Sequence, residues 1–249
     1  MPSSMPDMRF IKVRTRKILP PKDNLYAVFE NSLPRLKEGD VVVVTSKVVA
    51  IHQGRSVLIS EKISKKNLIK QEAERLMPRY EINGHGYTLT IKNYTLIASA
   101  GIDESNANGY YILWPEHPEK AAREICLYLK KKFRIKKLAV IITDSHITPL
   151  HLGTTGIAIG FFGLVPLRDY RRKPDIFGRK LKVTRSNLVD GLAAAAVLCM
   201  GEGKEQTPMV IIRDCAEIKF TNKETFKNLV ISPEEDLYFP LLKKFKKPS

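Results

Sequence analysis

The chain has 249 residues, which is enough for one large domain or two closely packed lobes. Hydrophobic residues make up 43% of it, which argues against a disordered chain, and no apolar run reaches the ~20 residues needed to cross a bilayer. The net charge of +16 favours an anionic partner, either nucleic acid, a membrane surface or a small phosphorylated or polycarboxylate ligand. Charge alone does not choose among these.

The N-terminal stretch MPSSMPDMRF lacks the apolar core of a signal peptide, so we expect a cytoplasmic protein. The three cysteines are odd in number and widely spaced, which fits neither a disulfide framework nor a paired-cysteine metal site. Cys126 and Cys199 fall in apolar helical patterns, so we predict that both are buried as small hydrophobic residues.

The first half of the chain predicts both strands and helices. Residues 8–18 alternate apolar and basic side chains, as a half-exposed strand does. DVVVVTSKVVA (40–50) opens with a β-branched run, which is typical of a strand buried on both faces, and 55–59 is expected to pair beside it. Helices are predicted at 25–33 and 62–76, followed by a hairpin over 81–100 with its turn at NGHG (83–86).

In the second half, residues 118–133 predict a strongly amphipathic helix. Residues 187–200 predict another helix, with Asn187 or Ser186 as its N-cap and Gly201 at its end. The remaining expected elements are a buried strand at 137–143 that ends at Asp144, a Gly-interrupted strand or bulged loop at 155–164, a basic loop at 168–179, strands at 181–185 and 208–213, and a helix from 232 onward that ends in a basic tail, 243–249.

These elements, without repeats or a low-complexity linker, predict an α+β fold with mixed β-sheets and flanking helices. We expect a single domain over residues 1–249, built either as one unit or as two intertwined lobes.

Three clusters of polar side chains fall where predicted strands or helices end: AGIDESN (100–106), IITDSH (141–146) and MGEGKEQTP (200–208). Such places commonly hold metal and catalytic ligands, although any one Asp-containing turn more often only caps the backbone. Together the clusters offer the oxygen ligands that Mg²⁺ or Mn²⁺ prefers, with glycines that let the backbone approach phosphate. The histidines lack metal-binding spacing, so zinc is not indicated.

The longest stretches around these clusters are GDVVVVTSKVVA, AGIDESN, ITDSHITPLHLGTTGIAIGFFGLVPLRDYRRKPDIFGRKLKVT and NLVDGLAAAAVLCMGEG. In this order, over roughly residues 10 to 215, they resemble the signature blocks of the coenzyme F420-0:γ-glutamyl ligase family. The resemblance implies the fold of that family and a homodimer. It also implies an acid–amino-acid ligase that uses GTP or ATP and, by expectation, two Mg²⁺ or Mn²⁺ ions. Such an enzyme activates a carboxylate as an acyl phosphate, which the amine of L-glutamate then attacks to form an amide.

The resemblance also carries residue roles over, by motif position. The metal ligands would be Asp103, Asp144, Ser145 and Glu202. The nucleotide site would be lined by Leu19, Pro20, Ser46, Lys47, Asn106, Met200, Gly201, Gly203, Lys204, Gln206 and Thr207. The candidate catalytic residues are Asp144, Lys47 and Arg168, because phosphoryl transfer depends mainly on alignment and on neutralised charge. Arg171 and Arg179 are further candidates for binding phosphate or carboxylate groups.

The chain departs from the family at two places. The motif DTFGRPWR, which lies beside the substrate in F420-type members, is replaced by DSHITPLH (144–151), and a lysine expected just after TSK is Ile51. DSHITPL and GEGKEQTP resemble a bacterial branch described as folate-metabolism γ-glutamate ligases. We therefore expect a folate or dihydrofolate acceptor that receives poly-γ-glutamate, with F420-0 as the alternative. His146 and His151 are candidate acceptor contacts, or else ordinary loop histidines.

Two other classes of function stay open. A basic nucleic-acid-binding protein would explain the +16 charge, but neither a helix-turn-helix nor a sheet with interleaved basic and aromatic residues is visible. A relative without catalytic activity, used for binding or assembly, is less expected because Asp103, Asp144 and Glu202 are all present.

Overall fold

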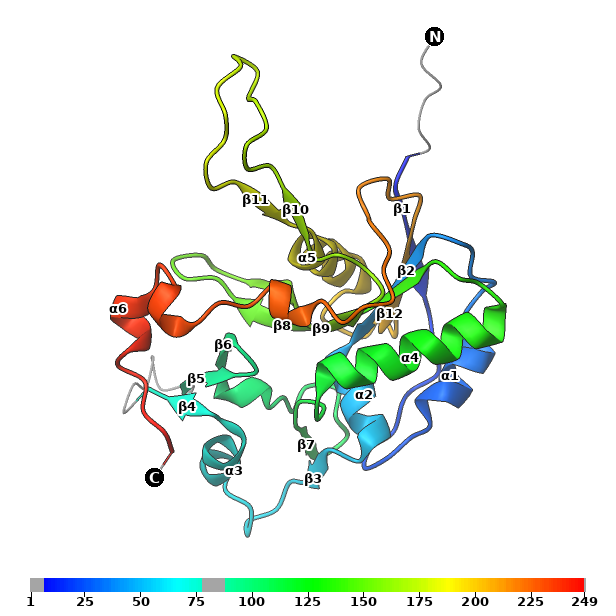
Figure 1. Cartoon of the computed structure of the whole chain (residues 1–249). Coiled ribbons are helices and arrows are strands. Elements are labelled where there is room, and N and C mark those ends of the chain that lie inside the picture. The colour runs from blue at the N-terminus through cyan, green and yellow to red at the C-terminus, as the bar shows by residue number, and fades with distance from the viewer. Residues whose placement is uncertain (1–6, 78–87, 249) are drawn as a thin grey trace.

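The computed structural model describes residues 7–77 and 88–248. Its largest element is a five-stranded sheet with the strand order β1-β12-β2-β8-β9 (Figure 1). β2 and β8 run parallel, and the other neighbouring pairs run antiparallel, so the mixed sheet confirms the predicted α+β class. The strands are β1 (Arg9–Val13), β12 (Met209–Arg213), β2 (Asp40–Thr45), β8 (Leu138–Ile147) and β9 (Thr154–Phe162).

Helices cover both faces of this sheet, which explains why β2 is a continuous run of valines. Val42 and Val44 face a core shared with α1 (Leu25–Ser32), α2 (Ser46–Gln53) and α4 (Pro118–Phe133). Val41 and Val43 face the opposite core, formed with α5 (Leu188–Met200). All four valines are completely buried, as predicted for a strand with no solvent face, and each contributes about 1.5–3 kcal/mol of burial free energy.

Three smaller sheets lie around the central one. β3 (Ser56–Leu58) pairs with β7 (Tyr110–Ile112), so the expectation that residues 55–59 pair beside 40–50 is wrong. β4 (Arg75–Leu76), β5 (Leu89–Lys92) and β6 (Thr95–Ala98) form a three-stranded sheet, followed by the 3₁₀ turn η1 (Ser99–Gly101). β5 and β6 confirm a hairpin within 81–100, whereas the expected NGHG turn lies outside the described residues.

The third small sheet is a projecting arm, residues 167–187, in which β10 (Leu167–Asp169) pairs with β11 (Arg185–Asn187). Figure 1 shows the arm extending away from the central sheet beside α5. The strand predicted at 181–185 is wrong, because the strand of this region is β11, which starts at Arg185.

Two helix predictions are confirmed almost to the residue. α4 spans the predicted residues, and α5 begins after Asn187, whose side-chain oxygen accepts the backbone N–H of Asp190 at 3.2 Å. Gly201 ends α5 with a positive φ of 78°, as predicted, and Asn187 rather than Ser186 is the N-cap. α3 (Lys65–Glu72) is shorter than the predicted 62–76, because Arg75 and Leu76 belong to β4.

Several predicted boundaries are wrong. The strand predicted within 40–50 ends at Thr45, and α2 begins at the next residue. The strand predicted at 8–18 ends at Val13. β8 continues through Asp144 to Ile147 instead of ending at it. Cys126 is buried as predicted, but Cys199 is only half-buried.

The C-terminal segment is not the predicted helix with a frayed basic tail. Among the described residues from 226 to 248, the helical elements are the 3₁₀ turns η2 (Phe226–Asn228) and η3 (Pro233–Glu235) and the one-turn α6 (Phe239–Leu242). The basic stretch after it is fastened at Lys246, which exchanges two backbone hydrogen bonds with Leu76, while Phe245 is buried. Among the described residues, no helix is both long and apolar enough to cross a membrane.

Candidate active site

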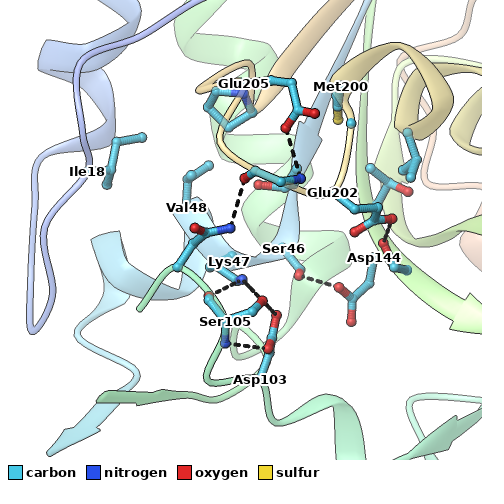
Figure 2. A pocket seen from close by; sticks show the side chains of 18 of the residues that line it. Ile18, Ser46, Lys47, Val48, Asp103, Ser105, Asp144, Met200, Glu202 and Glu205 are labelled. Carbon is cyan, nitrogen blue, oxygen red and sulfur yellow. Dashed lines mark hydrogen bonds and ion pairs between the residues drawn. The ribbon is translucent and has the colours of Figure 1, made fainter. Parts of the chain in front are cut away.

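A cavity of about 780 Å³ opens at one edge of the central sheet (Figure 2). Five stretches that are far apart in the sequence line it: 15–19, 45–51, 97–108, 143–147 and 197–208. Thr154, the first residue of β9, also lines it. All three polar clusters singled out in the sequence therefore meet at one place. A concave site with convergent polar groups is the usual form of a small-molecule site.

The parallel pairing of β2 and β8 brings two of these stretches together. Thr45 lies beside Thr143 in the ladder, so the carboxyl ends of both strands open at the same edge. Two backbone hydrogen bonds attach the loop after α5 to this edge. The N–H of Thr45 donates to the carbonyl of Pro208 at 3.0 Å, and the N–H of Thr15 donates to that of Gln206 at 2.9 Å.

Asp144 is half-buried, with part of its surface facing the cavity. Its two carboxylate oxygens accept hydrogen bonds from neutral donors: Ser46 Oγ to Oδ1 at 2.9 Å, and Trp114 Nε1 to Oδ2. Burial raises the pKa of Asp144 to about 6, and the nearby Asp103 carboxylate adds to this, against the lowering by the two donors. The carboxylate is thus placed where a bound cation would relieve its lost hydration.

Lys47 and Asp103 also line the cavity and form an ion pair, with Lys47 Nζ 2.7 Å from Asp103 Oδ2 (Figure 2). Lys47 Nζ also donates to the carbonyl oxygen of Ser105 at 2.6 Å. The Asp103 carboxylate in turn accepts the backbone N–H and the hydroxyl of Ser105 at 2.7 and 2.8 Å. Burial alone would raise the pKa of Asp103, but Lys47 and the hydrogen bonds from Ser105 together outweigh it and the net shift is downward, so Asp103 is ionised at neutral pH.

Glu202 joins the end of β8 to the loop after α5. Its Oε1 accepts the hydroxyl of Ser145 at 2.7 Å and that of Thr154 at 3.3 Å. Two of the predicted metal ligands, Ser145 and Glu202, are therefore in direct contact although they are 57 positions apart in sequence.

The loop that follows α5 is tightly folded. Gly201 has a φ of +78°, which L-residues with a side chain rarely adopt, and a Cβ there would lie 2.5 Å from the Glu205 carboxyl carbon, so the Glu205 side chain would have to move. Glu205 accepts the N–H of Gly203 at 2.8 Å, and Thr207 Oγ1 donates to the carbonyl of Met200 at 2.5 Å. Asn106 reaches this loop from the other side, its side-chain nitrogen donating to the carbonyl of Gly203 at 3.0 Å.

Most of the residues predicted for the site line this one cavity. Four do not: Pro20 is buried, and Arg168, Arg171 and Arg179 lie in the projecting arm. The Arg168 guanidinium lies 5.1 Å from the Tyr170 ring centroid, and Arg171 pairs with Asp169 at 2.5 Å. His146 lines the cavity and His151 does not. The residues that do line it are Leu19, Ser46, Lys47, Asp103, Asn106, Asp144, Ser145, Met200, Gly201, Glu202, Gly203, Lys204, Gln206 and Thr207.

The three predicted metal-binding carboxylates face the same cavity without forming a tight cluster. Within residues 7–77 and 88–248, no three His, Cys, Asp or Glu side chains gather closely enough to hold a metal ion. The donor chemistry nevertheless fits Mg²⁺ or Mn²⁺, because these ions are usually held by one or two carboxylates together with substrate phosphates. Asp144, with neutral hydrogen-bond donors on both oxygens, is the carboxylate best suited to this.

Sequence reasoning missed two parts of the site. Residues Thr15 to Ile18 line the cavity, but their alternation of basic and apolar side chains was interpreted as the end of a strand. Trp114 was not singled out at all, although it is the only tryptophan in the chain. Its place in YYILWP, shortly after the DESN cluster, is the one signal that could have drawn attention to it.

Comparison with known proteins agrees with this geometry. The F420-0:Gamma-glutamyl ligase family matches residues 12–214. A coenzyme F420:L-glutamate ligase of Methanopyrus kandleri is 34% identical over an alignment of 251 positions, which covers 94% of this chain and 98% of the relative. The ligase of the same name from Methanococcus maripaludis is 34% identical over 82% of this chain and 86% of its own length. The one from Halorubrum lacusprofundi is also 34% identical, over 77% of this chain and 81% of its own length. Since the family match spans most of the sequence and every stretch that lines the cavity, the chain belongs to the F420-0:γ-glutamyl ligase family.

Proposed function

We propose that this protein is a coenzyme F420-0:L-glutamate ligase, which forms an amide between L-glutamate and a carboxylate of F420-0. The observation that carries this proposal is that the family's separate motif stretches line one cavity of about 780 Å³. The relatives are named for this activity and match nearly the whole chain. They favour F420-0 over the folate-type acceptor expected from the sequence.

The reaction we propose has two steps. An oxygen of the acceptor carboxylate attacks the γ-phosphorus of GTP or ATP, forming an acyl phosphate and releasing the nucleoside diphosphate. The glutamate amine then attacks the acyl carbon, the bond to phosphate breaks, and the amine loses a proton as the amide forms. In such a reaction the protein supplies mainly alignment and charge neutralisation.

Each wall of the cavity suits one part of this task. The folded loop 200–207 offers backbone groups and Lys204 to a triphosphate, with Asn106 bracing the loop at Gly203. Lys47 is held at the opposite wall by Asp103 and Ser105, where it supplies a fixed positive charge. Asp103, Asp144, Ser145 and Glu202 would hold Mg²⁺ or Mn²⁺, which when bound neutralises phosphate charge. The basic residues at this cavity are better explained by polyanionic substrates than by nucleic acid.

A folate or dihydrofolate is the second candidate acceptor, because DSHITPLH (144–151) stands where F420-type members carry DTFGRPWR. His146 lines the cavity, and burial holds its pKa below the usual value, so its ring is neutral at pH 7. A neutral imidazole can stack on, or hydrogen-bond to, the flat heteroaromatic head that either acceptor presents. The choice between the acceptors thus rests on this side of the cavity.

The protein should also form a homodimer, with the projecting arm as a contact surface. Asp175 accepts the backbone N–H groups of Phe177 and Arg179, both at 2.9 Å, so the tip of the arm is an ordered turn. Ile176 and Phe177 nevertheless stand 92% and 88% exposed at that tip. Large apolar side chains on an ordered, projecting surface are typical of an interface between subunits.

The test is an assay with defined components. Purified protein would be incubated with F420-0 or dihydrofolate, L-glutamate, Mg²⁺ or Mn²⁺, and GTP or ATP, and mass spectrometry would detect a gain of one glutamyl unit. We expect product with F420-0, and we expect Asp144→Ala to abolish it while the exposed control Glu61→Ala does not. No product with either acceptor, under every pairing of metal and nucleotide, would remove the substrate proposal. An Asp144→Ala variant with wild-type turnover would remove Asp144 from the metal site.

A further inference from the structure

Trp114 lies directly behind the proposed metal site. It is the only tryptophan of the chain, its side chain is buried, and its Nε1 donates a hydrogen bond to Asp144 Oδ2. The ring does not line the main cavity. Trp114 belongs instead to the lining of a second cavity of about 240 Å³. It reaches the first cavity through two residues that line it, Asp144 and Gly101.

The hydrogen bonds at Asp144 determine how that carboxylate is oriented. Ser46 binds one oxygen and Trp114 the other, so the carboxylate plane is fixed from both sides. Both donors are neutral and therefore leave the negative charge available. A carboxylate can accept about four hydrogen bonds or metal bonds in all, so each oxygen keeps a lone pair for a ligand in the cavity.

The indole is itself held firmly in place. A Cβ at Gly101 would lie 2.0 Å from Nε1, so the indole packs against a backbone that only glycine allows. The backbone on either side of the ring's attachment is anchored as well, since Arg55 Nε donates to the backbone carbonyl of Trp114 at 3.2 Å and the carbonyl of Arg55 accepts the N–H of Leu113 at 3.0 Å. Arg55 is anchored in turn by Glu72, 2.5 Å from its guanidinium.

From this arrangement we propose that Trp114 is a positioning residue of the metal site, acting through its N–H on the ligand Asp144. The inference rests on the proposed function, because it takes Asp144 to be a metal ligand. Groups that hydrogen-bond to a metal ligand orient it toward the ion, and losing one typically weakens metal binding about 10- to 100-fold. Packing of the indole alone would require no N–H.

The single tryptophan allows a test that removes the N–H and little else. In a tryptophan auxotroph, β-(benzothienyl)alanine replaces Trp114 alone and puts sulfur where the N–H was, while 5-fluorotryptophan keeps the N–H. Binding of Mn²⁺ to the full chain would be measured from the electron paramagnetic resonance signal of free Mn²⁺. We expect the benzothienyl protein to bind Mn²⁺ about 10- to 100-fold more weakly than wild type, and the fluorotryptophan protein to bind it normally.

Two further measurements separate this inference from the proposed function. Asp144→Asn should weaken Mn²⁺ binding in wild-type protein, and Mg²⁺ should shift the ¹⁹F resonance of the fluorotryptophan protein only while Asp144 is present. Normal Mn²⁺ affinity in a folded benzothienyl protein, with Asp144→Asn impaired, would overturn the role of Trp114 and leave the metal site standing. Normal affinity in Asp144→Asn would overturn both.

Discussion

Gly101 is required both by its backbone conformation and by the packing of the Trp114 indole behind the site. Its φ is +73°, a region that side chains of L-residues rarely adopt, and it leaves the space that the Trp114 indole fills. Gly109 has a similar φ of +83°, but nothing lies within 4 Å of where its Cβ would be. A side chain at either glycine would therefore be strained in its backbone conformation, but only a side chain at Gly101 would also clash with a neighbour.

Gly101→Ala should lower the free energy of unfolding by about 2–4 kcal/mol, since about 1 kcal/mol of conformational strain adds to about 1–3 kcal/mol of overpacking against the indole. Gly109→Ala should cost only about 1 kcal/mol. Chemical denaturation of both variants would measure the difference. Equal destabilisation would mean that the indole moves aside at little cost.

Asp23 holds the segment between β1 and α1, which lines the cavity at Arg16 to Leu19. Its carboxylate accepts both Arg16 amino groups, at 2.6 and 2.7 Å, and the backbone N–H groups of Leu19 and Asn24, at 3.1 and 2.7 Å. The hydrogen bonds from Arg16, more than burial or the backbone donors, set its pKa well below the usual range.

A lowered carboxylate pKa stabilises the fold above the pKa of the unfolded chain, about 3.9, and this stabilisation is lost as pH falls toward the folded pKa. Asp23→Asn should therefore destabilise the protein by about 1–2 kcal/mol at pH 7, because Arg16 is half exposed and solvent screens the pair. Urea melts at several pH values should show this gap shrinking below about pH 4. The exposed control Glu61→Gln should show no gap, and a gap for Asp23→Asn that did not change with pH would contradict the assignment.

At the scale of elements, the two ends of α5 were predictable and the end of β8 was not. α5 was predicted because an Asn N-cap and a terminal Gly bracket its apolar run. β8 was predicted to end at Asp144 because apolar residues stop there, yet its backbone ladder continues opposite β9 to the pair Ile147 and Thr154. Strand pairing satisfies backbone groups whatever the side chains are, so polarity alone cannot mark where a strand ends.

Part of the candidate site was likewise predictable from the sequence and part was not. The polar residues of three motifs were predicted to converge, and they line one cavity, because family motifs carry that spatial information. The contact of Trp114 with Asp144 joins positions 30 apart through tertiary packing. No local pattern encodes such a contact, and the same holds for the path of residues 15–18 along the cavity.

The N-cap of α5 gives a prediction at this scale. Asn187→Ala should lower the free energy of unfolding by about 1 kcal/mol, since it removes the acceptor of the Asp190 N–H and the donor to the Asp190 carboxylate. Asp190 also accepts the N–H of Ala158 in β9 at 2.9 Å, so the cap connects the helix to the sheet. Thermal melts of Asn187→Ala and of its neighbour Ser186→Ala would compare the two candidate caps. A larger loss for Ser186→Ala would contradict the cap geometry.

At the scale of the whole molecule, the arm stands out because it projects away from the central sheet and exposes apolar side chains at its tip. Light scattering after size exclusion should give twice the chain mass of 28.3 kDa. The double change Ile176→Glu and Phe177→Glu should shift the protein toward the monomer, because it places charge on the apolar tip. The matched change Lys180→Glu alters charge on the same arm without touching the apolar pair. A wild-type monomer, or an unchanged dimer in the double variant, would exclude this contact.

The strand order also determines when the fold can be completed during synthesis. Among the described strands β1 pairs with β12 alone, and β12 lies between β1 and β2. Until residue 213 has left the ribosome, the N-terminal strand lacks its neighbour and β2 presents an open edge. A nascent chain therefore carries a valine-rich, unpaired edge through most of translation, a form prone to aggregate and in need of chaperones. Premature termination anywhere before β12 would leave that edge permanently open.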